Sequence, residues 1–155
     1  ALAEMRSMLL ELRSDALPNQ NLEQLITALA EGARVRSAMA VSLAVQGECE
    51  LPLSGDVSLT FYRIAQEALN NVIKHAEATQ VDIALLCQPD RVALRIRDDG
   101  RGFDPQQIPD GHLGISIMAE RARKIGADLT ILSIPGRGSE VRLIWQKPAK
   151  GAAHV

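Results

Sequence analysis

The sequence predicts a two-layer α/β sandwich in which three helices lie against a mixed, mostly antiparallel sheet. Three segments, 20–37, 57–77 and 113–126, carry apolar residues at helical spacing. Five shorter segments carry the strand pattern, with turn-forming residues between them. The chain has 155 residues and 46% apolar content, which is enough to bury one core and predicts one main domain.

A further helix is expected before this domain, over residues 2–16. Its apolar residues alternate at spacings of three and four, which is typical of a coiled-coil seam. A lone helix of this length is marginal in water, so it needs either its own domain or a second helix as a partner. Pro18 and Asn19 end the helix and open a linker over 18–21. The seam residues are Leu2, Met5, Leu9, Leu12 and Ala16.

The elements of the main domain follow one another with clear boundaries. Gln88, Pro89 and Asp90 predict a hairpin turn, and Gly126 predicts the end of a helix. The expected order is a helix over 20–37, strand 40–46, helix 57–77, strands 80–87 and 91–98, helix 113–126, and strands 127–134 and 139–146 joined through 135–138.

Residues 98–114 contain the most informative pattern in the chain. Asp98 continues the inward-facing apolar row of strand 91–98, so its carboxylate should point toward the core, where it needs hydrogen-bond partners. Two glycines follow at once, and two more precede the next helix. An Asp-Gly turn is the simple alternative, but an inward acid, a flexible loop and a glycine-marked helix start together predict a nucleotide pocket. The four glycines are Gly100, Gly102, Gly111 and Gly114.

Helix 57–77 carries polar residues beside its apolar stripe. Glu67, Asn71 and Lys74 follow the spacing i, i+4, i+7 and share one face, with His75 at its edge. A solvated surface is the alternative interpretation. Asn71 favours a site, because an amide oxygen is a suitable ligand for a magnesium ion that phosphates help to hold.

Four motifs resemble those of the catalytic and ATP-binding domain of two-component sensor histidine kinases. Residues 61–76 (FYRIAQEALNNVIKHA) resemble the N box, 98–102 (DDGRG) the G1 box, 111–122 (GHLGISIMAERA) the G2 box, and 136–139 (GRGS) the final glycine motif. The N-box and G2-box variants are similar to those of the nitrate-sensor and desaturase-sensor subfamily, whose regulators are of the NarL type. The resemblance covers roughly residues 20–147 and implies the Bergerat (GHKL, HATPase) form of the sandwich.

The resemblance implies a role for each matching polar residue. Asp98 would accept a hydrogen bond from the adenine amino group, and Ser139 would help through a water. Asn71 would ligate the Mg²⁺ that bridges the phosphates of ATP, with Lys74 and His75 close to those phosphates. The acid of the N box, Glu67, would be catalytic, because the acid at the corresponding position activates water in the related ATPases of the superfamily.

The resemblance also implies roles for the glycines. Gly100 and Gly102 would let the backbone pass close to the base. Gly111 and Gly114 would hinge a lid over 103–110 and free backbone amides at a helix start, where the helix dipole favours phosphate. His112 and Leu113 lie in the same motif and are expected at the ATP site.

The chain contains three histidines, and none is expected to be the phosphoacceptor. His75 and His112 lie in motifs, His154 lies in the tail, and none is followed by Asp or Glu on an amphipathic helix. The resemblance therefore implies transfer of the γ-phosphoryl group of Mg-ATP to a histidine outside this chain, and relay to a NarL-type response regulator.

The implied organisation has four parts. Residues 1–17 would be the end of the dimerisation and phosphoacceptor helices of a homodimeric parent protein, and 18–21 the linker. Residues 22–147 would be the ATP-binding catalytic domain, and 148–155 a disordered tail.

The composition argues against several classes of partner and site. A net charge of −2 without a basic run predicts no nucleic-acid partner. The chain has no apolar run of membrane length, so this segment is expected to make no direct membrane contact, whether its parent is soluble or anchored. Cys49 and Cys87 match no CxxC or zinc pattern, and we expect reduced thiols in the cytoplasm.

Two alternative functions stay open. One is a serine kinase of the anti-sigma-factor type on the same fold, which the coiled-coil segment disfavours. The other is a degenerate domain that serves only for docking or dimerisation, which the intact Asn71, Asp98 and four glycines disfavour.

Overall fold

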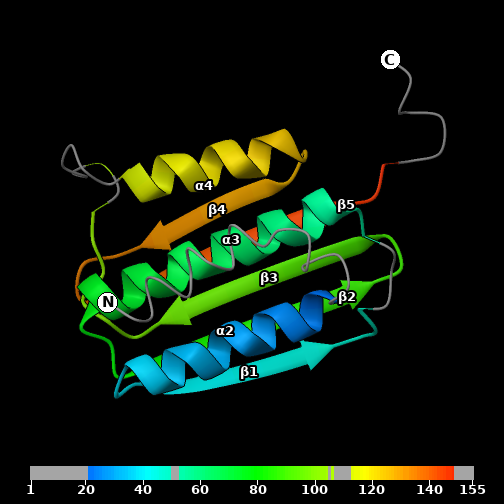
Figure 1. Ribbon diagram of the computed structural model, residues 1–155. Coiled ribbons are helices and arrows are strands. Elements are labelled where there is room, and N and C mark those ends of the chain that lie inside the picture. Colours follow the sequence, from blue (N-terminus) through cyan, green and yellow to red (C-terminus); the bar gives the residue numbers. More distant parts are fainter. Residues whose placement is uncertain (1–20, 50–52, 105, 107–112, 149–155) are drawn as a thin grey trace.

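The computed structural model describes residues 21–49, 53–104, 106 and 113–148. Within them, three helical segments cover one face of a five-stranded sheet (Figure 1). The helices are α2 (Leu22–Arg36), α3 (Gly55–Asn71), which continues as a π-helical turn η2 (Val72–Ala76), and α4 (Leu113–Lys124). The predicted two-layer sandwich is confirmed. The expected helix 2–16, the linker up to residue 20 and the tail from residue 149 lie outside the described residues.

The sheet is mixed, as predicted, and its strand order is β1-β2-β3-β5-β4. Strand β1 pairs in parallel with β2, and the other neighbouring strands pair antiparallel. The β2–β3 hairpin turns at Pro89 and Asp90. The strands are β1 (Ala40–Gln46), β2 (Gln80–Gln88), β3 (Arg91–Asp98), β4 (Asp128–Ser133) and β5 (Ser139–Gln146).

Helix α2 begins with a capping box, which explains why it starts at Leu22. The Asn21 side chain accepts from the Gln24 backbone amide at 2.8 Å, and the Gln24 side chain accepts from the Asn21 amide at 3.1 Å. Asn21, which was expected to close the linker, is therefore the helix N-cap. Near the other end, Arg34 donates through Nε and Nη2 to the carbonyl of Val41 at 3.1 and 3.0 Å and covers part of the β1 edge.

The core lies between the helices and the sheet. Alternate residues of β2 and β3 are buried, and α3 runs over the middle of the sheet with Phe61 and Ile64 fully buried. Burying one such side chain contributes roughly 1.5–3 kcal/mol. On the opposite sheet face, polar side chains pair with one another, for example Arg142 with Glu140 at 2.6 Å. The helices therefore have one face of the sheet to cover.

The predicted helix 57–77 is not one regular α-helix. Ser54 caps α3, the α-helical part ends at Asn71, and the next five residues form the wider turn η2. The turn ends at Glu77, which has a φ of 51° in the left-handed region. Such π-turns occur mostly as single turns in helices, often at functional sites.

Helix α4 ends at Lys124, two residues before the predicted end at Gly126. Among the described residues, no helix is long and apolar enough to cross a membrane.

The expectation of two reduced cysteines was wrong. Cys49 and Cys87 form a disulfide, with their Cα atoms 5.3 Å apart. Strand β1 pairs with β2 in parallel up to Gln46 and Leu86, so the residues that follow on both strands emerge side by side. Sequence spacing alone does not show this proximity, because it arises from the pairing of segments far apart in the chain.

Removing the disulfide should destabilise the domain. It closes a loop across a sequence separation of 38 residues, and losing a cross-link of this span should lower the free energy of unfolding by about 2–4 kcal/mol. Urea unfolding of the oxidised and reduced protein measures the difference. A double variant, Cys49→Ala with Cys87→Ala, is the control and should unfold identically with and without reductant. Identical midpoints for the oxidised and reduced natural sequence would contradict the bond.

Candidate nucleotide-binding site

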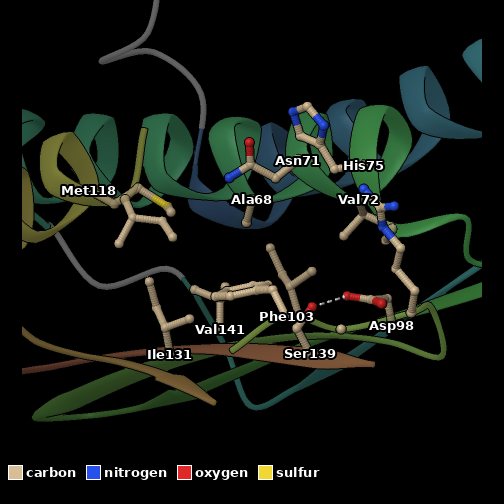
Figure 2. Close-up of a pocket in the computed structure, with 15 residues that line it drawn as sticks. Ala68, Asn71, Val72, His75, Asp98, Phe103, Met118, Ile131, Ser139 and Val141 are labelled. Carbon is tan, nitrogen blue, oxygen red and sulfur yellow. Dashed lines mark hydrogen bonds between the residues drawn. The ribbon is translucent and has the colours of Figure 1, made fainter. Parts of the chain in front are cut away.

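A cavity of about 360 Å³ lies between the helical layer and the sheet. Helices α3, η2 and α4 form one wall, and β3, β4 and β5 with the loop after β3 form the other (Figure 2). Most of the lining is apolar, with a small set of polar side chains, as in typical small-molecule sites. The lining residues are Ala68, Asn71, Val72, His75, Ala76, Ile96, Asp98, Arg101, Gly102, Phe103, Ile115, Met118, Ile131, Ser139 and Val141.

Asp98 is a buried acid at the end of β3, only 4% exposed. Its Oδ1 accepts from the backbone amide of Gly100 at 2.8 Å. Its Oδ2 accepts from the hydroxyl of Ser139 at 2.7 Å, the dashed line in Figure 2. Ser139 is the cross-strand partner of Asp98 on β5. The inward carboxylate is thus confirmed. A carboxylate offers roughly four acceptor positions, so two such bonds leave capacity for a donor on a ligand.

The loop after Asp98 is pressed against two neighbouring segments. A side chain on Gly100 would collide with the carbonyl oxygen of Ala76 at the end of η2, and one on Gly102, at φ +63°, would collide with that of Ile134. The Arg101 amide donates to the Ala76 carbonyl at 2.7 Å. Both glycines are therefore required by the protein's own backbone. Their expected approach to a base stays a prediction.

The helical wall brings Asn71 and His75 to the cavity from successive turns of α3 and η2 (Figure 2). Glu67, one turn earlier, is half-buried and lies away from the cavity lining. Its carboxylate instead packs so closely on Gly114, at the start of α4, that a Cβ at Gly114 would collide with it. The N-box acid and the G2-box glycine therefore touch one another.

A family model for histidine kinase-, DNA gyrase B- and HSP90-like ATPases matches residues 56–149. The chain belongs to this family. It is 31% identical to the sensor histidine kinase LiaS of Bacillus subtilis (strain 168) over 140 residues, and this alignment covers 90% of the chain and 38% of LiaS. It is 34% identical to the sensor protein VraS of Staphylococcus epidermidis (strain ATCC 12228) over 140 residues, and this alignment covers 90% of the chain and 39% of VraS. The chain thus spans about two fifths of the length of these relatives.

Solved structures have the same fold. The histidine kinase domain of the blue-light activated histidine kinase EL346 of Erythrobacter litoralis superposes with a TM-score of 0.66 at 20% identity, over 80% of this chain and 64% of that one. The mycobacterial sensor histidine kinase MprB superposes with a TM-score of 0.62 at 20% identity, over 84% and 97%. The predicted Bergerat-type sandwich is therefore confirmed.

In this histidine kinase-like ATPase domain, the predicted site residues are partly brought together. Asn71, His75, Asp98, Gly102 and Ser139 line one cavity, and Gly100 lies against Asp98. Lys74 is exposed and does not contribute to the lining. Gly111 and His112 lie outside the described residues, and Leu113 is described only as the first residue of α4.

Several lining residues were missed by sequence reasoning. Arg101 and Phe103 stand beside the G1-box glycines, and Met118 lies one helical turn after Gly114. The available signal was their position, because Arg101 and Met118 lie inside the G1 and G2 motifs and Phe103 directly follows the G1 motif. The Phe103 amide donates to the Ser133 hydroxyl at 2.8 Å, which ties the start of this loop to the end of β4.

Asp99, the second acid of the G1 box, lies outside the cavity lining and was also missed. Its Oδ1 accepts from the backbone amides of Thr79 and Gln80 at 2.8 and 2.9 Å, and its Oδ2 accepts from the Thr79 hydroxyl at 2.5 Å. The hydroxyl of Thr79, followed by the amide of Gln80, holds the pKa of the Asp99 carboxyl below its ordinary value. The group is therefore a carboxylate at neutral pH.

Replacing Asp98 with alanine should weaken ATP binding by about 10- to 100-fold, because a ligand amino group loses its buried acceptor, a loss of roughly 1–3 kcal/mol. Calorimetric titration with ATP measures this loss. GTP, which presents a carbonyl in place of the adenine amine, should bind the natural sequence weakly.

The matched control is Asp82→Ala. Asp82 lies on the uncovered face of neighbouring strand β2, where its carboxylate accepts from Ser42 at 2.5 Å, and it should not affect nucleotide binding. Equal ATP affinities for Asp98→Ala and Asp82→Ala would remove Asp98 from the site.

Proposed function

We propose that this domain binds Mg-ATP and directs its γ-phosphoryl group to a histidine outside these 155 residues, as the catalytic part of a sensor histidine kinase. The observation that carries the proposal is the hydrogen-bonded Asp98 at the end of a largely apolar cavity, with Asn71 and His75 on the opposite wall. A buried hydrogen-bond acceptor in a largely apolar cleft suits a flat heterocycle with an amino group.

The adenine ring would lie in the cavity with its amino group donating to Asp98. Ser139, whose hydroxyl donates to Asp98 at 2.7 Å, would hold the carboxylate in place and support a bridging water. Ile96, Met118 and Val141 offer apolar contacts to the ring. A base with a carbonyl at the same position would face the carboxylate with a second acceptor, so the site should discriminate against guanine.

The triphosphate would extend along the helical wall. Asn71 and His75 line that side, and Lys74 and the G2-box residues Gly111, His112, Leu113 and Gly114 would contribute near the phosphates. Among the described residues, no group of three or more acidic, His or Cys side chains could hold a metal. This fits Mg²⁺ brought by the nucleotide, which needs one or two protein ligands, and the Asn71 amide oxygen is of the right kind.

Catalysis would then rest on positioning and charge neutralisation, the main contributions to phosphoryl transfer. Glu67 is the proposed catalytic residue. Its contact with Gly114 supports a role at the junction between the N box and α4, where the terminal phosphate would arrive.

The partners proposed for the parent protein are its own phosphoacceptor helices, in a homodimer, and a NarL-type response regulator. Support comes from the N-box and G2-box variants and from the relatives LiaS and VraS, a sensor histidine kinase and a sensor protein, of which this chain matches about two fifths. We propose that the domain acts in the cytoplasm, where ATP is supplied.

Replacing Asn71 with alanine should weaken Mg-ATP far more than adenosine, because the metal chiefly bridges the distal phosphates. Titrations with and without Mg²⁺ measure the two affinities. The matched control is Asn70→Ala on the same helix. Asn70 turns toward α2, where its side chain accepts from Arg36 at 3.0 Å, so its removal should leave nucleotide binding unchanged. Equal losses of ATP and adenosine in Asn71→Ala would contradict the metal-ligand role.

Incubation with γ-labelled ATP should leave this chain unlabelled, since its acceptor would lie elsewhere. A longer protein that carries the upstream helix pair should acquire an acid-labile phosphate. Phosphoamino-acid analysis distinguishes the outcomes. A label on His75, His112 or a serine of this chain would contradict the proposal, and a serine label would favour the anti-sigma-factor type of kinase.

A further inference from the structure

Two segments that form opposite walls of the cavity are joined by a compact set of hydrogen bonds. One segment, 76–80, leads from the end of η2 into β2, and the other, 98–101, is the G1-box loop. We name the bonds between them the Thr79–Asp99 clasp. Its members are Thr79 amide to Asp99 Oδ1 at 2.8 Å, Gln80 amide to Asp99 Oδ1 at 2.9 Å, Thr79 hydroxyl to Asp99 Oδ2 at 2.5 Å, Asp99 amide to Gln80 carbonyl at 3.3 Å, and Arg101 amide to Ala76 carbonyl at 2.7 Å.

The clasp lies beside the site, not in it. Asp99 and Thr79 do not line the cavity, whereas Asp98, Arg101 and Ala76, their near neighbours in sequence, do. Apart from the loss of its charge, which Asp99→Asn shares with Asp99→Ala, a change at Asp99 would therefore act on a ligand through the position of the two walls.

The two segments are in close contact at this junction. Gly100 packs so tightly on Ala76 that a Cβ would collide with it, and Glu77 occupies the left-handed region. Three of the five bonds end on one ionised carboxylate, and such charge-assisted bonds are stronger than neutral ones. Asp99 is thus the group that holds the exit of η2 on the G1 loop.

We infer that Asp99 is a positioning residue that fixes the phosphate side of the cavity relative to its adenine side. The inference rests on the proposed function. Asp98, the proposed acceptor for the adenine amino group, directly precedes Asp99 in the G1-box loop. His75, on the phosphate side, directly precedes Ala76, the first residue of the other segment. A ligand that engages both sides gains most when their separation is fixed in advance, as for any two linked contacts.

The inference predicts different effects on the binding of adenosine and of Mg-ATP. Without the clasp each half of the site is intact, so adenosine, which uses the adenine side, should bind almost as before. The additional affinity that the triphosphate provides should fall. In Asp99→Ala we expect the ratio of the adenosine Kd to the Mg-ATP Kd to drop by about 10- to 100-fold, because the phosphate contacts lose part of the effective concentration that a fixed geometry provides. A general loss of stability would weaken both ligands together and leave the ratio unchanged.

The experiment compares this ratio, from nuclear magnetic resonance titrations, in the natural sequence, Asp99→Ala, Asp99→Asn and Thr79→Val, with the melting temperature of each protein. Asparagine keeps an oxygen that accepts from the two backbone amides, and its side-chain NH2, which replaces Oδ2, can donate to the Thr79 hydroxyl oxygen. Asp99→Asn should therefore restore most of the ratio. Thr79→Val removes one bond with little change of shape and should lower the ratio less than Asp99→Ala. Asp82→Ala is the control, because its carboxylate accepts from Ser42 and from the Gln80 side chain on the uncovered face.

Each outcome is decisive. A lower ratio in Asp99→Ala that Asp99→Asn restores supports the inference. An unchanged ratio, or equal weakening of both ligands, overturns it while leaving the proposed function intact. If the natural sequence itself fails to bind Mg-ATP, the proposed function is wrong and the inference falls with it. If Asp99→Ala does not fold, Thr79→Val decides by the same criterion.

Discussion

The Asp98 carboxylate must be hydrogen-bonded where it lies, because an ionisable group in a core without partners is strongly destabilising. Both partners impose geometry on the rest of the domain. The amide of Gly100 reaches it only if the chain turns back two residues later, and the hydroxyl of Ser139 reaches it only in the observed β3–β5 register. The turn of the G1 loop and the placement of β5 therefore serve one buried acid.

The same turn couples the sheet to the helices. To fold back at Gly100, the loop must pass against Ala76, and this contact fixes where the helical wall ends. The cavity is consequently formed by segments that bond to each other at Ala76 and Arg101, and α4 contributes Met118 to the helical wall (Figure 2). Hydrogen bonds at the junction of η2, β2 and the loop join the two walls, while apolar packing along α3 holds the layers together.

The sequence predicted features that depend on local geometry. Alternation in β2 and β3 and the apolar stripe of α3 predicted the layers, and the period of β3 predicted the inward Asp98, because these periods follow directly from backbone shape. It did not predict the Cys49–Cys87 bond, the π-turn or the Asp99 contacts. The first depends on the parallel pairing of β1 with β2, and the last on a turn between segments about twenty residues apart. A π-turn has the same residue types as an α-helix, so composition gives no signal for it.

The π-turn η2 has a consequence for how the domain tolerates changes in length. A turn with i→i+5 bonds contains one more residue than an α-helix needs to cover nearly the same path. Deleting one residue within Val72–Ala76 would let the helix continue as α, with its two ends barely displaced. Because the deletion removes the extra residue that the π-turn accommodates, the side chains on either side of it would keep nearly the same orientation. A deletion between Asn71 and His75 would therefore leave both residues facing the same cleft, and a change of chain length that would disrupt a regular α-helix would here preserve both the fold and the site.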